Sequence, residues 1–156
     1  MADTENQASR LLAIGALSDV STSECQNGRP QDGEENARRA LALALKEYGP
    51  KSALYNGIEY TLAACFVELH RPREADPLLA KIDPKPVAVL TGSPLWYCNV
   101  LLAQAEAAFQ EKRFQKARRL AKASEPGFSD PKQNEYQFRR LKALEASLQA
   151  VPGSKE

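Results

Sequence analysis

The segment Arg71–Leu79 reads RPREADPLL and directly follows a predicted turn. A proline is well tolerated at the first position of a helix, and Ala75 provides a small side chain where a second helix can approach closely. The same arrangement recurs 42 residues before and after this segment. The recurring turn pairs and the small residues that follow them are Arg29-Pro30 with Gly33, Arg71-Pro72 with Ala75, and Arg113-Phe114 with Ala117. A period of this length is typical of stacked helical hairpins.

The register extends to both sides of these turns. Positions four and seven residues after the small residue are again small or apolar, and so is a position shortly before the turn. These three sets are Ala37, Leu79 and Ala121; Ala40, Ile82 and Ser124; and Cys25, Val67 and Phe109. Because one hairpin cannot bury its apolar stripe alone, neighbouring hairpins are expected to bury these stripes against each other.

Between breaks rich in glycine and proline, the chain consists mainly of strong helix formers, and alternation typical of strands is almost absent. The sequence therefore predicts an all-α fold. The expected helices cover residues 5–26, 31–47, 51–69, 73–82, 94–111, 114–124 and 132–149. The last helix is amphipathic and is expected to cap the array, with one face formed by Tyr136, Leu141, Leu144, Leu148 and Val151.

These residues resemble the tetratricopeptide repeat, whose second helix begins with an aromatic residue or proline, two polar residues and alanine. The segment Arg71–Leu79 and the segment Arg113–Ala121 carry the resemblance, and the 42-residue spacing is similar to that of the kinesin-light-chain subclass. The resemblance covers residues 51–124, with a more divergent repeat before them. It implies one domain over 1–156: a right-handed α-solenoid of three antiparallel hairpins (about 10–47, 51–82 and 94–124) with a capping helix at 132–149.

Composition excludes several classes of protein. Apolar residues make up 43% and charged residues 26% of 156 residues, and the net charge is +1, so disorder and a global attraction to nucleic acid are not expected. Three cysteines without a Cys-x-x-Cys spacing make a disulfide framework improbable and are compatible with a reducing compartment. The acidic first residues do not resemble a secretory signal. The uncharged stretch Val87–Ala105 is interrupted at Gly92-Ser93-Pro94. The prediction is a soluble, cytoplasmic protein without a membrane span.

Catalytic and metal-binding chemistry is not predicted. His70, the one histidine, lies at a predicted turn, and Cys65 is five residues away, off the spacings that share a helix face. No phosphate loop, Gly-x-Ser-x-Gly or Gly-x-Gly-x-x-Gly motif occurs. Cys25, Cys65 and Cys98 lie among apolar neighbours in three different predicted helices, where a cysteine usually acts as a small buried apolar residue. We therefore expect no enzyme, no metal and no cofactor.

A binding function follows from the resemblance, since the first helices of such repeats line a concave groove. The register places in this groove Tyr60, Ala64, Glu68, Asn99, Leu102, Glu106 and Gln110. Tyr60 would either anchor a bound peptide or pack between repeats, and both alternatives remain open. The expected partner is another protein or peptide, held as a partner helix or extended segment by a non-catalytic scaffold.

Charge is distributed unevenly and offers an alternative surface. Residues 1–36 contain seven acids and two bases, whereas residues 109–145 contain ten bases and five acids. The alternative is contact with an acidic protein or nucleic acid through a basic C-terminal face formed by Lys112, Arg113, Lys116, Arg119, Lys122 and Arg139. No aromatic residue is interleaved with these bases in the way that stacking platforms for nucleic acid require, so nucleic acid is the less expected partner. The opposite charge of the two ends also permits head-to-tail self-association.

Overall fold

The computed structural model describes residues 2–82, 95–130, 132 and 134–152, with side chains described from residue 6 onward. Its described part is all-α and contains no strand, which confirms the predicted fold class. Contacts divide the chain into two compact units, residues 1–82 and 83–156, and each unit is described by itself. The single solenoid over 1–156 therefore stays a prediction.

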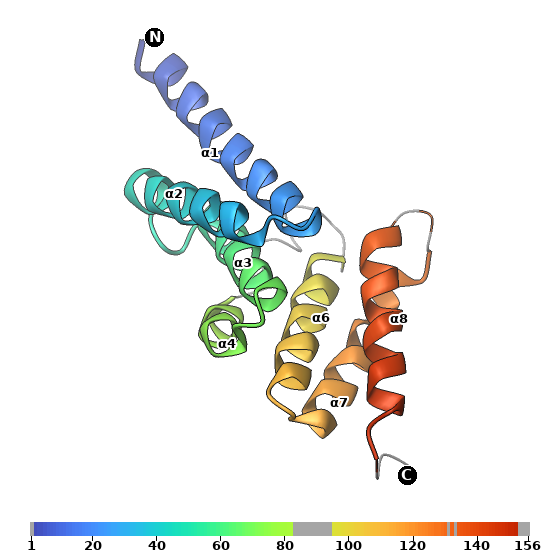
Figure 1. The fold of residues 1–156 in the computed structure, drawn as a ribbon. Helices are drawn as coiled ribbons and strands as arrows, with labels where there is room; N and C mark the ends of the chain where they lie inside the picture. Colours follow the sequence, from blue (N-terminus) through green and yellow to red (C-terminus); the bar gives the residue numbers. More distant parts are fainter. Residues whose placement is uncertain (1, 83–94, 131, 133, 153–156) are drawn as a thin grey trace. The chain divides into compact units, whose positions relative to one another are not determined.

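The first unit consists of two helical hairpins. These are α1 (Ala2–Gln26) with α2 (Pro30–Tyr48), and α3 (Ala53–Glu68) with α4 (Pro72–Lys81). α3 packs against α1, α2 and α4, so it is the central helix of the unit (Figure 1). A core of Ile14, Ala40, Ala44 and Ile58 joins the first hairpin to α3.

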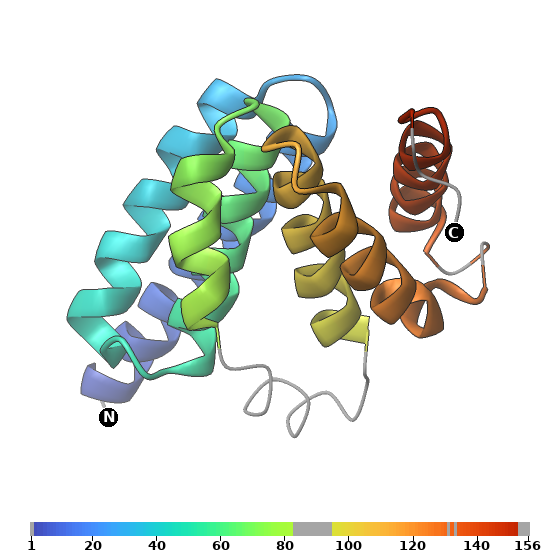
Figure 2. The same ribbon diagram turned by 90° about the horizontal axis from the view of Figure 1, so that it is seen from below.

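The second unit contains one hairpin and a closing helix. α6 (Leu95–Gln110) and α7 (Phe114–Ser124) form the hairpin, a 3₁₀ turn η1 (Glu125–Phe128) follows, and α8 (Glu135–Gln149) packs on α6, α7 and η1 (Figure 1, Figure 2). The predicted apolar face of α8 is confirmed at its centre, where Leu141, Leu144 and Leu148 are buried. These three leucines share a core with Leu102 and Phe128.

The turns of the two units show the predicted register in their backbone. Gly28, His70 and Lys112, spaced 42 residues apart, all have a positive φ, of 79°, 54° and 60°. In each case the N–H of the next residue donates to the carbonyl oxygen five residues before it: Arg29 to Glu24 (2.9 Å), Arg71 to Phe66 (2.8 Å) and Arg113 to Ala108 (2.8 Å). The same helix-ending turn is therefore built three times, and His70 is an exposed turn residue, as expected.

The small and apolar positions of the register are buried in all three hairpins. Ala75 and Ala117 have no exposed surface, and Gly33 is buried at the equivalent position. The next two sets are buried as well: Ala37, Leu79 and Ala121, then Ala40, Ile82 and Ser124. The prediction that these positions form the close helix contacts is confirmed.

The expectation that a disulfide is improbable is wrong. Cys25 near the end of α1 and Cys65 in α3 form a disulfide, with their Cα atoms 5.4 Å apart. α1 packs against α3, and this tertiary contact brings together two cysteines that are 40 residues apart in sequence. With this bond, the cysteine-based argument for a reducing compartment no longer holds.

The disulfide also explains why the first repeat has glycine where the others have alanine. A Cβ atom at Gly33 would lie 2.3 Å from the Cys25 sulfur and 2.8 Å from the carbonyl oxygen of Ser21. Ser21 itself donates a hydrogen bond to the Gly33 carbonyl at 2.7 Å. The backbone of α2 therefore approaches α1 at Gly33 more closely than any side chain would allow.

The helix predicted at 114–124 ends at Ser124, as expected, and the residues after it form a 3₁₀ turn whose Phe128 is buried. Pro126 is tolerated there because it stands at the start of the turn. One predicted boundary needs correction. The last helix begins at Glu135 rather than at 132, since the Lys132 N–H donates to the Asp130 side chain (2.9 Å) in a local turn.

In the part of the chain that the structure describes, no helix is both long enough and apolar enough to cross a lipid bilayer. The predicted break at Gly92-Ser93-Pro94 and the first part of the uncharged stretch Val87–Ala105 lie outside the described residues.

Candidate functional site

The predicted groove residues of the first unit lie on the accessible face of α3. Tyr60, Ala64 and Glu68 are half-buried and follow one another at intervals of four residues, which places them in one stripe. The other faces of α3 are buried against the neighbouring helices. We call these three residues the α3 stripe.

The predicted groove residues of the second unit are not equivalent to the α3 stripe. Leu102 has no exposed surface and belongs to the core of the unit, so its placement in a groove is wrong. Asn99 and Gln110 are half-buried on α6. The side-chain oxygen of Asn99 is buried and has no hydrogen-bond partner among the described residues.

Glu106 faces the closing helix. The Arg140 guanidinium of α8 contacts both of its carboxylate oxygens, with an Nε–Oε1 distance of 2.9 Å, and both side chains are 14% exposed. Arg140 also lies over the Tyr136 ring, 5.4 Å from its centroid. This two-point ion pair fixes α8 on α6, so Glu106 is a structural residue of the cap. No local sequence pattern predicts this pairing, because the two residues lie 34 positions apart.

The predicted basic face separates into residues that line cavities and residues that do not. Lys112, Arg113 and Lys116 line one cavity and Lys122 lines another, whereas Arg119 and Arg139 are exposed and line neither. Arg139 forms an exposed ion pair with Glu135 at 2.8 Å. The predicted face is therefore two sites with different surroundings.

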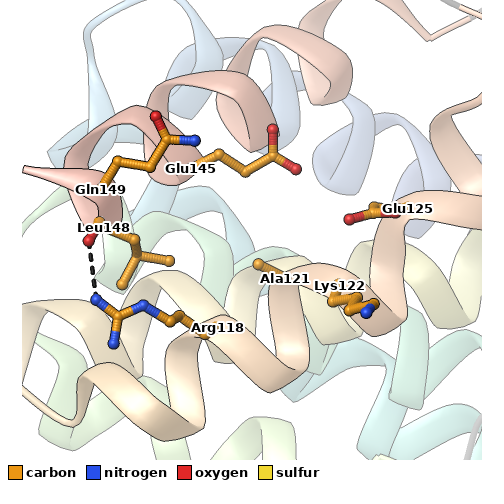
Figure 3. A pocket seen from close by; sticks show the side chains of 7 residues that line it. All are labelled: Arg118, Ala121, Lys122, Glu125, Glu145, Leu148 and Gln149. Carbon is orange, nitrogen blue, oxygen red and sulfur yellow. Dashed lines mark hydrogen bonds between the residues drawn. The ribbon is translucent and has the colours of Figure 1, made fainter. Parts of the chain in front are cut away.

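The first cavity, of about 350 Å³, lies between α7 and α8 (Figure 3). Arg118 spans one end and donates to the Leu148 carbonyl oxygen at 2.9 Å. Two basic and two acidic side chains balance each other around the cavity. We call it the α7–α8 cavity, lined by Arg118, Ala121, Lys122, Glu125, Glu145, Leu148 and Gln149.

The second cavity, of about 400 Å³, lies at the start of α7. Of the described side chains that line it, four are basic and none is acidic. Arg118 belongs to both cavities, and it was absent from the predicted basic face. We call this the α7-start cavity, lined by Lys112, Arg113, Phe114, Gln115, Lys116, Arg118, Val151 and Pro152.

Within the described residues, no three His, Cys, Asp or Glu side chains are grouped as metal ligands. Cys65 is bonded to Cys25, so the pair Cys65–His70 contains no free thiol. Burial raises the pKa of the Cys98 thiol, partly offset by a hydrogen bond from the Gly127 backbone. A buried thiol with a raised pKa is a weak nucleophile.

One buried carboxyl group was missed by sequence reasoning. Glu59 of α3 is 5% exposed, and burial raises its pKa, while Lys81 and the hydroxyl of Tyr55 favour the charged form. Burial raises the pKa of Tyr55, and the charge of Glu59 and its hydrogen bond with Tyr55 raise it further. The groups that interact with Glu59 are Lys81 and Tyr55 of the same unit. Neither is a second carboxyl group, so the described contacts of Glu59 include no pair of carboxyl groups.

Comparison of the chain with protein-family models, curated protein sequences and solved structures finds no match.

Proposed function

We propose that the chain is a non-catalytic protein-interaction module, built from tetratricopeptide-like hairpins in a right-handed solenoid, that binds a peptide or a partner helix. The observation that carries the proposal is the α3 stripe, an accessible strip on a helix whose other faces are buried. Support for the hairpin type comes from the three equivalent turns spaced 42 residues apart.

The composition of the α3 stripe suits contact with a helix or an extended peptide. Tyr60 offers a large aromatic surface with a polar end, which gives contact area at a small entropic cost. Ala64 allows a second backbone to approach closely, and Glu68 offers a charged acceptor at one end of the stripe. Because α3 is held by three neighbouring helices, little conformational entropy is lost when a partner binds.

A peptide-display selection against the full chain tests this function. The enriched peptides are then measured by fluorescence anisotropy against the wild type and Ala64→Trp, whose new indole fills the stripe. Ala42→Trp on α2 is the matched control, because Ala42 is exposed and outside the stripe. We expect Ala64→Trp to weaken binding about tenfold or more and Ala42→Trp to leave it unchanged.

Two outcomes contradict the proposal: a selection that enriches no peptide, and enriched peptides that bind Ala64→Trp as tightly as the wild type. Circular dichroism of both variants establishes that each keeps its helices, so that a loss of binding is not a loss of fold.

The cation-rich α7 favours a second candidate function, binding of an acidic protein segment. Phe114–Ser124 contains four basic residues and no acidic one. Complementary charge raises association rates and is screened by salt, so binding at this surface should weaken strongly between 50 mM and 500 mM NaCl. Peptides bound at the α3 stripe should show a much smaller salt dependence. Binding of nucleic acid, rather than an acidic peptide, at the basic surface of α7 would identify nucleic acid as the partner.

A further inference from the structure

The two cavities of the second unit share Arg118 but differ in charge. In the α7–α8 cavity, Glu125 and Glu145 balance Arg118 and Lys122. Among the described residues that line the α7-start cavity, no carboxylate balances the four cations of Lys112, Arg113, Lys116 and Arg118. Its volume, about 400 Å³, lies within the range of cavities that hold small molecules or one or two peptide side chains.

The cations of the α7-start cavity are held by different parts of the fold. Lys112 stands at the turn, where its backbone has a positive φ of 60°, and Lys116 lies four residues further on, in α7. The Arg118 guanidinium is anchored by its hydrogen bond to the Leu148 carbonyl at the end of α8. Arg113 is paired with Glu111, which does not line the cavity. Three cations therefore remain once the Arg113–Glu111 pair is counted as neutral.

The backbone adds to this positive potential. α7 begins at Phe114, and Arg113 at its N-cap supplies no side-chain hydrogen bond to the first turn. The first N–H groups of a helix lack partners within the helix and favour negative charge. This end of the helix borders the cavity through Phe114 and Gln115.

From the cation-lined cavity we infer a site for a phosphomonoester dianion, presented by a phosphorylated segment of a partner protein. This inference rests on the proposed protein-binding function and names the chemistry of the partner at its basic surface. A phosphoryl group carries about two negative charges at neutral pH, whereas a carboxylate would leave two of the three cations uncompensated. The apolar wall of Phe114, Val151 and Pro152 suits a peptide side chain better than an isolated ion.

The test measures binding of a degenerate phosphoserine peptide library to the full chain by fluorescence anisotropy. The same library without phosphate, the library with glutamate in place of phosphoserine, and inorganic phosphate are measured in parallel. We expect the phosphorylated library to bind about tenfold or more tightly than each of the other three, because charge-assisted hydrogen bonds to phosphate are stronger and more numerous.

Two double variants with the same change in charge locate the site. Lys112→Glu/Lys116→Glu places two carboxylates in the α7-start cavity, and phosphopeptide binding should fall about tenfold or more. Lys46→Glu/Lys51→Glu makes the same charge change at exposed residues of the first unit, outside that cavity, and should bind within about twofold of the wild type. Circular dichroism confirms that both variants are folded.

Three results overturn the inference. An equal loss in both double variants indicates general electrostatic attraction, and equal binding of the glutamate library indicates a carboxylate site. Inorganic phosphate binding as tightly as the phosphopeptides indicates a site for small phosphates. Ala64→Trp should leave phosphopeptide binding unchanged, so the failure of this inference and the failure of the α3 stripe are distinguishable.

Discussion

The two units of this chain are built around the same turn but are closed by different interactions. In the first unit, a disulfide joins α1 to α3 and one arginine of the second turn links the two hairpins. In the second unit, the closing helix α8 supplies apolar side chains to a larger core, with Phe128 buried below it. The shared turn fixes the path of the backbone, whereas the closure of each unit depends on the residues around it.

The arginine of the turn shows this difference at one position. Arg71 bonds Glu34 of α2 at 2.5 Å and Glu74 of α4 at 2.6 Å, and its guanidinium lies 4.7 Å from the centre of the Phe66 ring. Its equivalent in the second unit, Arg113, is paired with the adjacent Glu111. In the first unit this arginine links two hairpins, whereas in the second unit Arg113 pairs beside its own turn and lines a cavity with other basic side chains.

The largest effect is expected when a charge is placed at a close helix contact of the second unit. Ala117 has no exposed surface, so Ala117→Glu would bury a carboxylate between helices and should cost about 4 kcal/mol or more. Ala123→Glu on the exposed face of the same helix is the control and should change stability little. Fluorescence of Trp96, the one tryptophan of the chain, reports unfolding of this unit. A wild-type melting curve for Ala117→Glu would contradict the register.

The next effect tests whether the first unit depends on its covalent bond. Cross-linking residues 40 positions apart removes entropy from the unfolded chain worth about 4 kcal/mol, and reduction should lower the free energy of unfolding by about 2–4 kcal/mol. Urea unfolding with and without dithiothreitol measures this loss. Cys25→Ser/Cys65→Ser should unfold at the same urea concentration with and without dithiothreitol. Cys98→Ala should lose as much stability on reduction as the wild type does. An unchanged midpoint for the reduced wild type would show that the bond does not stabilise the unit.

A smaller change in stability is expected at a feature that the two units share, a glycine whose backbone packs on a cysteine. A Cβ atom at Gly33 would lie 2.3 Å from the Cys25 sulfur, and one at Gly127 would lie 2.3 Å from Cys98 Cβ. Gly33→Ala and Gly127→Ala should each cost about 1–3 kcal/mol through overpacking. Gly57→Ala, which meets no atom within 4 Å, should stabilise α3 by about 0.5–1 kcal/mol. Chemical denaturation measures the free energy of unfolding of the three variants. The same change in all three would contradict this prediction.

The smallest effect concerns the buried carboxyl group of the first unit. Because burial raises the pKa of Glu59, the folded chain binds its proton more tightly than the unfolded chain does. Ionisation of Glu59 therefore costs stability, and this cost appears as the pH rises above the ordinary carboxyl value of 4.5.

Glu59→Gln should raise Tm at pH 7 by an amount on the order of a few °C, and the gain should shrink toward pH 4. Thermal melts between pH 4 and pH 8 provide the measurement. Glu35→Gln, at an exposed position of α2, is the control and should show no such trend. A gain that is equal at every pH would assign the effect to packing rather than to ionisation.

Local patterns were sufficient to predict the helices, the turns and the small buried residues. Pro30 and Pro72 begin helices because proline fits the first turn, and Ala75 and Ala117 are buried because close helix contacts exclude larger side chains. The accessible position of Tyr60, Ala64 and Glu68 on α3 also followed from the register. The prediction that Leu102 lines a groove was wrong although Leu102 has the same register position as Tyr60, because α8 and η1 help to bury that side of α6.

The sequence by itself determined which segments are helical, where the chain turns and which positions pack closely, since these depend on neighbours within one or two helical turns. Only the tertiary structure decided that Cys25 bonds Cys65, that Arg140 binds Glu106, and that the basic residues of α7 divide between two cavities. Each of these outcomes depends on the distance between helices that are far apart in sequence, and no spacing along the chain encodes that distance.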